Sequence, residues 1–143
     1  CEEEPIFRYT DGYSNTRKTV EAFLNLPEQD RQKILELHAR PNLKAGVWNP
    51  VQAVREPGFG SLLFADDEII GRLRQLGCNL SGDKENEAAQ FLRTTAANAF
   101  VCGNFKLGHS ERALFAQLSR VNHHCRPNAA RIEHGEGARL VAL

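Results

Sequence analysis

The sequence predicts an α+β fold in which helices come first and short strands follow. Up to about residue 99, apolar residues recur at steps of three and four, which is the spacing of one helical face. Beyond that point the apolar segments are short and are separated by glycines, a pattern typical of strands and hairpins. With 143 residues, the chain is long enough for one domain that buries a core of its own.

The elements can be placed from their apolar stripes and their ends. The opening residues alternate loosely up to a turn at Asp11-Gly12, so we expect the end of a strand there. Pro27 suits the first turn of the second helix, and Gly77 suits a left-handed exit from the third, which Asp66 or Asp67 can cap at its start. Helices are expected at about 16–26, 26–40, 66–76 and 83–99, with Ile34, Leu37 and His38 on one face of the second. Residues 99–107 and 112–118 are expected to be short strands or irregular core segments, and residues 129–133 and 138–143 to form a hairpin with glycines in its turn.

Residues 41–60 interrupt this pattern. Three prolines and three glycines fall within them, so neither a helix nor a central strand can persist. We expect a surface connection there, or a place where an insertion is tolerated.

The composition narrows the classes of partner and compartment. Lys and Arg total 18 and Asp and Glu total 18, so the balanced charge gives no reason to expect nucleic acid or an anionic membrane as partner. No apolar run is long enough to span a bilayer. The four cysteines lie far apart in a chain that is not cysteine-dense, so we expect free thiols in the cytosol or nucleus.

The stretch "SRVNHHCRPNA", residues 119–129, concentrates groups that can ligate metals or act as nucleophiles. A metal site would draw on His123, His124 and Cys125. Neighbouring residues in an extended backbone point to opposite sides, however, and the chain has no C-x-x-C pair. A thiol nucleophile at Cys125 would need a base within hydrogen-bond reach, which sequence neighbours seldom provide.

A third interpretation of this stretch is a rigid turn. Pro127 fixes its own backbone and restricts that of Arg126, so the chain leaves the turn in a defined direction. The side-chain amides of Asn122 and Asn128 can each donate and accept hydrogen bonds. Such a turn could bind a cofactor through main-chain groups while Asn122 supplies a side-chain contact.

The same stretch closely resembles the N-H-S-C-x-P-N motif of SET-domain protein methyltransferases. "TTAANAF", followed by "ALFAQLSRVNHHCRPNAARI", resembles the order of segments in the SET-and-MYND type and its fungal relatives, and "CEEEPIF" is similar to the strand after their first glycine-rich cofactor loop. The resemblance covers most of residues 1–143 as a partial SET domain. It implies a helical insert at about 14–97 and a core motif region at 98–143.

The resemblance implies an S-adenosyl-L-methionine-dependent protein-lysine N-methyltransferase, with a SET-type fold of small β-sheets. Asn122, His123, Ser119 and Asn98 match residues that bind the cofactor in this family. Phe100 matches a wall of the lysine channel. Cys125 matches the cysteine that joins three cysteines of a post-SET segment around zinc, so a zinc site is expected only if those cysteines exist elsewhere in the full-length protein. The implied partner is a protein lysine side chain, as in histones, in the nucleus or cytoplasm.

The chain departs from the family pattern at several points. His124 stands where the family usually has Ser, the early G-x-G loop is missing, and so is the late strand that ends in the catalytic Tyr. We therefore expect a segment of a longer polypeptide that lacks the first and last segments of the fold, is inactive alone, and has its catalytic Tyr outside residues 1–143. The alternative is a catalytically dead SET-like module that binds proteins.

Three of the matched residues also have a simpler structural interpretation. Asn98 could cap the C-terminus of the fourth helix. Phe100 could belong to the core, as large aromatic residues usually do. Ser119 could satisfy only a turn amide.

Overall fold

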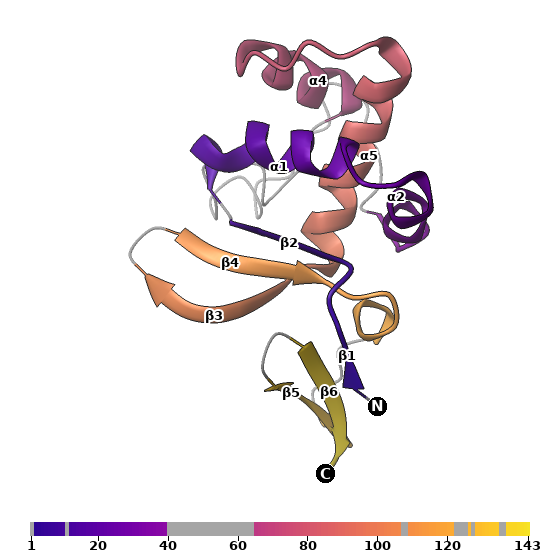
Figure 1. The fold of residues 1–143 in the computed structure, drawn as a ribbon, viewed down its shortest axis with the longest axis vertical. Coiled ribbons are helices and arrows are strands. Elements are labelled where there is room, and N and C mark those ends of the chain that lie inside the picture. Colours follow the sequence, from indigo (N-terminus) through magenta and orange to yellow (C-terminus); the bar gives the residue numbers. More distant parts are fainter. Residues whose placement is uncertain are drawn as a thin grey trace.

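The computed structural model describes residues 2–10, 12–39, 65–106, 109–121, 126, 128–134 and 137–143. Its fold is α+β, with helices at one end and two small antiparallel sheets at the other (Figure 1). The helices are α1 (Thr16–Leu24), α2 (Glu28–Leu35), α4 (Asp66–Gln75) and α5 (Gly82–Asn98), with 3₁₀ turns η1 (Tyr13–Asn15) and η3 (Leu118–Arg120). The strands are β1 (Glu2–Glu3), β2 (Phe7–Thr10), β3 (Phe100–Lys106), β4 (His109–Leu114), β5 (Ala129–His134) and β6 (Gly137–Ala142).

Each sheet combines a hairpin from the second half of the chain with a strand from its start. The strand orders are β1-β6-β5 and β2-β4-β3, and every pairing is antiparallel. Phe7 of β2 lies opposite Leu114 of β4, and Glu3 of β1 lies opposite Ala138 of β6. The expected hairpin of β5 and β6 is confirmed. The segments at about 99–107 and 112–118, expected as short strands or irregular core segments, form a second hairpin, β3–β4. The pairing of both hairpins with the N-terminal strands had no signal in the sequence.

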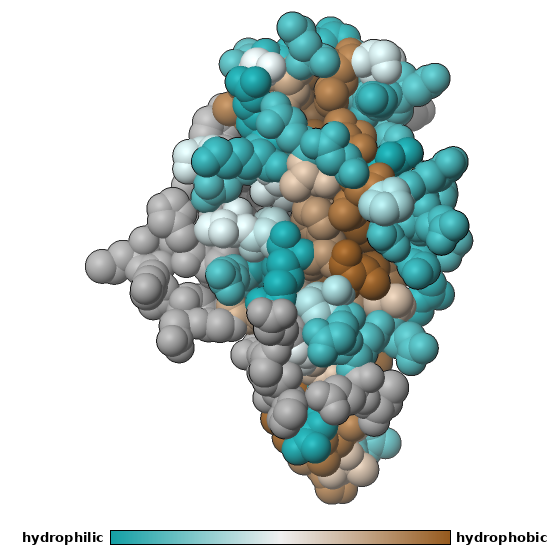
Figure 2. All heavy atoms as spheres, viewed as in Figure 1, coloured by the Kyte–Doolittle hydropathy of each residue, from teal (hydrophilic) through white to brown (hydrophobic). Residues whose placement is uncertain are grey.

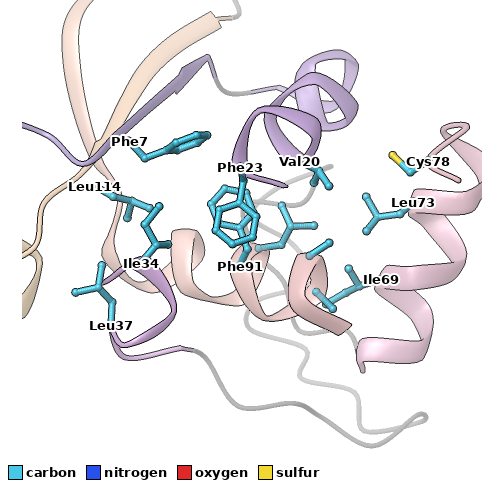
Figure 3. Close-up of a cluster of buried hydrophobic side chains, with 13 residues drawn as sticks. Phe7, Val20, Phe23, Ile34, Leu37, Ile69, Leu73, Cys78, Phe91 and Leu114 are labelled. Carbon is cyan, nitrogen blue, oxygen red and sulfur yellow. The ribbon is translucent and has the colours of Figure 1, made fainter. Parts of the chain in front are cut away.

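Helix α5 is the centre of the helical part and runs from the other helices down to the sheets (Figure 1). The ring of Phe91 on α5 stacks on Phe23 of α1 with centroids 4.1 Å apart, and it meets Phe7 of β2 edge-on at 5.5 Å. Figure 3 shows these rings with Ile34 and Leu114 on one side and Ile69 on the other. Burial of this cluster is the main apolar contribution to the helical part.

Three ion pairs set the direction in which α2 and α4 lie on α5. Arg93 Nε lies 2.8 Å from Asp66 Oδ1, and both side chains are mostly buried. Arg74 Nε and Nη2 bind the two oxygens of Glu85, which raises the pKa of Arg74 through this hydrogen-bonded pair. A third pair joins Arg31 to Glu87 at 2.9 Å. The Arg74 and Arg93 pairs are forked, with two bonds each. Because such bonds are directional, they fix the orientation of α4 on α5, which apolar packing alone does not determine.

The four predicted helices are confirmed, with differences at their ends. The prediction that Asp66 or Asp67 caps α4 is wrong: Ala65 is the residue before the first helical turn, and Asp66 is held by Arg93. Helix α2 ends at Leu35, and His38 is exposed although the periodicity placed it on the apolar face. The expected connection at 41–60 lies outside the described residues.

The surface is mixed rather than uniformly polar. Figure 2 shows an apolar band along the middle of one face, bordered by polar atoms, and a second apolar area at the end formed by β5 and β6. Among the described residues, the exposed large hydrophobic side chains are those of Val121, Ile132 and Leu143. No described helix combines the length and the hydropathy needed to cross a bilayer.

Two glycines of the α4 region give a matched stability test. Gly77 follows α4 with φ of 86°, and an added Cβ would lie 2.9 Å from Arg17 Nη1. Gly71 is inside α4, and an added Cβ would meet nothing within 4 Å. We expect Gly77→Ala to lower the free energy of unfolding by about 1–2 kcal/mol, because the left-handed conformation is costly for alanine. Gly71→Ala should raise it by up to about 1 kcal/mol through helix propensity.

Urea unfolding of both variants beside the wild type measures the two shifts. Equal shifts of the same sign would show that the conformation at Gly77 does not stabilise the end of α4.

Candidate functional site

A cavity of about 710 Å³ lies where the segment after α2, the end of α5 and the turn η3 meet. The segment after α2 contributes Glu36, Leu37 and His38 to the lining. Helix α5 contributes its last two residues, Ala97 and Asn98, and η3 contributes Ser119 and Arg120. Phe100 and Val121, which follow α5 and η3, also line the cavity. Three of the residues that the sequence singled out, Asn98, Ser119 and Phe100, therefore line one cavity.

Asn98 is a cross-link rather than a helix cap. Its Nδ2 donates one hydrogen bond to the carbonyl oxygen of Thr94 at 2.8 Å and another to that of His38. Two carbonyl acceptors determine the orientation of the carboxamide, because the reverse orientation would place Oδ1 against both oxygens. Among the described residues no donor bonds to Asn98 Oδ1. Asn98 is 8% exposed and lines the cavity, so its Oδ1 is available as an acceptor there.

Ser119 holds the cavity wall together from the other side. Its Oγ accepts a hydrogen bond from the Phe115 amide at 3.0 Å and donates one to the Asn98 carbonyl at 3.1 Å. The expected turn-amide contact is thus present, and the second bond ties η3 to the end of α5. Both bonds place the hydroxyl within the wall of the cavity.

Phe100 is half-buried and belongs both to the cavity and to the core between the two sheets. Its ring meets that of Phe115 edge-on at 6.0 Å. The guanidinium carbon of Arg131, on β5, lies 4.6 Å from the centroid of the Phe100 ring, which is within the range of a cation–π contact. The two sheets are thus joined beside the cavity.

Opposite charges lie at the cavity. Glu36 and Arg120 are both exposed and both line it, and Arg120 Nε donates to the Ala116 carbonyl at 2.9 Å, which orients its side chain. Val121, 51% exposed, also lines the cavity. Polar groups at the mouth and apolar groups on the walls are the usual arrangement of a small-molecule site.

Asn122, His123 and Cys125 lie outside the described residues, as do His124 and Pro127. Val121, the residue before Asn122, lines the cavity. The cofactor-binding roles of Asn122 and His123 and the metal role of Cys125 stay predictions.

The described part of the chain offers neither a metal site nor a reactive thiol. No three of its His, Cys, Asp and Glu side chains lie close enough together to hold a metal ion. Cys78 and Cys102 are buried and free, as expected for small apolar residues. Burial, and then the Glu21 carboxylate, raise the pKa of the Cys78 thiol, which is the opposite of what a nucleophile needs.

Sequence reasoning missed the α2 side of the cavity. Leu37 and His38 were expected on the inward face of a longer helix, whereas the helix ends at Leu35 and the His38 carbonyl faces Asn98. A main-chain acceptor leaves no mark in the side-chain pattern, so no signal could have found it.

Comparisons with protein-family models, with curated proteins and with solved structures returned no significant match.

Ser119→Ala tests the cross-link in the cavity wall. The change leaves the Phe115 amide without an acceptor beside a ring that is 1% exposed. We expect a loss of about 1–3 kcal/mol in the free energy of unfolding, the cost of a buried unsatisfied polar group. Ser119→Thr, which keeps the hydroxyl, should recover most of it, and Ser14→Ala at an exposed serine is the control. A loss no larger than that of the control would show that the hydroxyl does not stabilise the wall.

Proposed function

We propose that this chain is part of a SET-type, S-adenosyl-L-methionine-dependent protein-lysine N-methyltransferase, and that the 710 Å³ cavity is part of its cofactor site. One observation carries the proposal. Asn98, Phe100 and Ser119 were selected by resemblance to a motif, and all three line the same cavity. Val121, next to the Asn122-His123 pair that the resemblance assigns to the cofactor, lines it too.

The residues of the cavity suit S-adenosyl-L-methionine. This molecule carries an ammonium, a carboxylate, a sulfonium and an adenine ring, so it needs a fixed acceptor, charged groups and apolar walls. Asn98 Oδ1 is such an acceptor, Arg120 and Glu36 offer opposite charges, and Leu37, Phe100 and Val121 offer apolar surface. The volume lies within the roughly 300–1,000 Å³ typical of cofactor sites.

S-adenosyl-L-methionine, when bound, supplies the methyl group and a good leaving group. The residues of this chain then bind, orient and exclude water. Asn98 holds a donor of the ligand through Oδ1, while Ser119 keeps the wall at a fixed distance from the end of α5. Phe100 contributes apolar surface, which lowers the pKa of an incoming lysine and favours the neutral amine that can react.

Further contacts come from residues outside the described ranges. Asn122 and His123 complete the cofactor contacts, and the catalytic Tyr lies outside residues 1–143. Cys125 is a zinc ligand if the full-length protein supplies further cysteines. The substrate is a protein lysine, in the nucleus or cytoplasm.

Calorimetric titration of the full-length protein with S-adenosyl-L-methionine tests the proposal directly. We expect saturable binding at one site. Asn122→Ala should weaken it by about tenfold or more, the cost of about one hydrogen bond to a charged group. Asn79→Ala is the matched control, because Asn79 is exposed and does not line the cavity. A methyl-transfer assay on mixed histones, run on the same proteins, measures the activity.

No saturable binding would overturn the methyltransferase interpretation and favour the catalytically dead interaction module. Unchanged affinity in Asn122→Ala would remove Asn122 from the site. Loss of an esterase or protease activity on alkylation of Cys125 would support the thiol interpretation instead.

A further inference from the structure

A carboxylate from the N-terminal strand holds the turn that forms one wall of the cavity. Glu3 Oε1 accepts a hydrogen bond from the Gln117 amide at 2.9 Å, and Oε2 accepts one from the Leu118 amide at 3.0 Å. These amides open η3, where no intrahelical acceptor is available to them. Bonds from amides to an ionised carboxylate are stronger than those to a neutral acceptor. Glu3 therefore fixes the start of the turn across 114 residues of sequence.

The residues that follow directly are those of the cavity wall. Ser119, Arg120 and Val121 line the cavity, and Ser119 donates to the Asn98 carbonyl. The turn is thus held on one side by Glu3 and on the other by the end of α5. A change in the position of the Glu3 carboxylate would therefore alter where the turn lies relative to Asn98, whose side chain is held by its bonds to Thr94 and His38.

A glycine on β6 keeps Glu3 in place. In the β1–β6 pairing Glu3 lies opposite Ala138, next to Gly137. A Cβ on Gly137 would lie 2.8 Å from the Glu3 carbonyl oxygen and 3.3 Å from Glu4 Oε1. A distance of 2.8 Å between a Cβ and a carbonyl oxygen is shorter than van der Waals contact allows, and this oxygen belongs to the backbone of β1. A side chain at Gly137 would therefore push β1 away. The close approach of β1, and with it the reach of the Glu3 carboxylate, depends on Gly137.

We propose that Glu3 is a positioning residue for ligand binding in the cavity, acting through the turn at 117–120 and depending on Gly137. The identity of the ligand rests on the proposed function, whereas the link from Gly137 through Glu3 to the turn does not. The affinity of the cavity is therefore coupled to the pairing of β1 with β6.

The test compares Glu3→Ala, Glu3→Gln, Gly137→Ala and the Glu3→Ala/Gly137→Ala double variant in the full-length protein. Amide hydrogen exchange at Gln117 and Leu118 reports the turn, and calorimetric titration with S-adenosylhomocysteine reports the cavity. In Glu3→Ala and in Gly137→Ala we expect these two amides to exchange roughly tenfold faster than in the wild type, or more. The affinity for S-adenosylhomocysteine should fall by a comparable factor, because a charge-assisted hydrogen bond is lost. The double variant should be no worse than the worse single variant, because both changes break one link.

Graded behaviour separates positioning from general destabilisation. Glu3→Gln keeps the length of the side chain and one acceptor oxygen, so its exchange and affinity should lie between wild type and Glu3→Ala. If Glu3→Ala fails to fold, Glu3→Gln takes its place in the test. Glu4→Gln and Gly71→Ala are matched controls at a neighbouring exposed carboxylate and at an unobstructed glycine, and both should keep wild-type exchange at 117–118.

Unchanged exchange at Gln117 and Leu118 in Glu3→Ala would overturn the proposal, as would additive effects in the double variant. If the wild type does not bind S-adenosylhomocysteine, the proposed function fails, and the exchange measurements alone decide the role of Glu3. Faster exchange in both Glu3→Ala and Gly137→Ala would then still support the link.

Discussion

The burial of α5 is the constraint on which the rest of the structure depends. Its Phe91 ring lies against Phe23 of α1 and Phe7 of β2, and arginine–carboxylate pairs join it to α2 and α4. A helix with neighbours on several sides cannot shift without loss of apolar burial on all of them. Its C-terminal end, at Asn98, is therefore a fixed point in the molecule.

The candidate site uses that fixed point. The side-chain amide of Asn98 donates to main-chain oxygens of α5 and of the segment after α2. The main-chain carbonyl of Asn98 accepts a hydrogen bond from the Ser119 hydroxyl. A polar network in which each bonded group is satisfied holds its geometry without help from a ligand. No donor of the described residues binds Asn98 Oδ1, so this acceptor is available to a group in the cavity. Such preorganisation suits a site whose task is to align a reactive cofactor rather than to react itself.

Contacts between the two ends of the chain complete this arrangement. The sheets add β1 to β6 and β2 to β4, and the Glu3 carboxylate reaches the amides at the start of η3. Such contacts join residues more than a hundred positions apart, so their closure costs chain entropy that local helices do not incur. The wall of the cavity therefore depends on contacts between the two ends of the chain.

The sequence by itself determined the helices, the β5–β6 hairpin and the α+β class, because each follows from local periodicity and turn residues such as Gly77. It also indicated Asn98, Phe100 and Ser119, through a motif that gives the order of these residues in the chain but not the distances between them in the fold. Only the tertiary structure decided that these residues share a cavity, that Leu37 and the His38 carbonyl complete it, and that Glu3 caps a distant turn. Main-chain acceptors and long-range pairings depend on how elements pack, and packing between distant segments leaves no periodic trace in the chain.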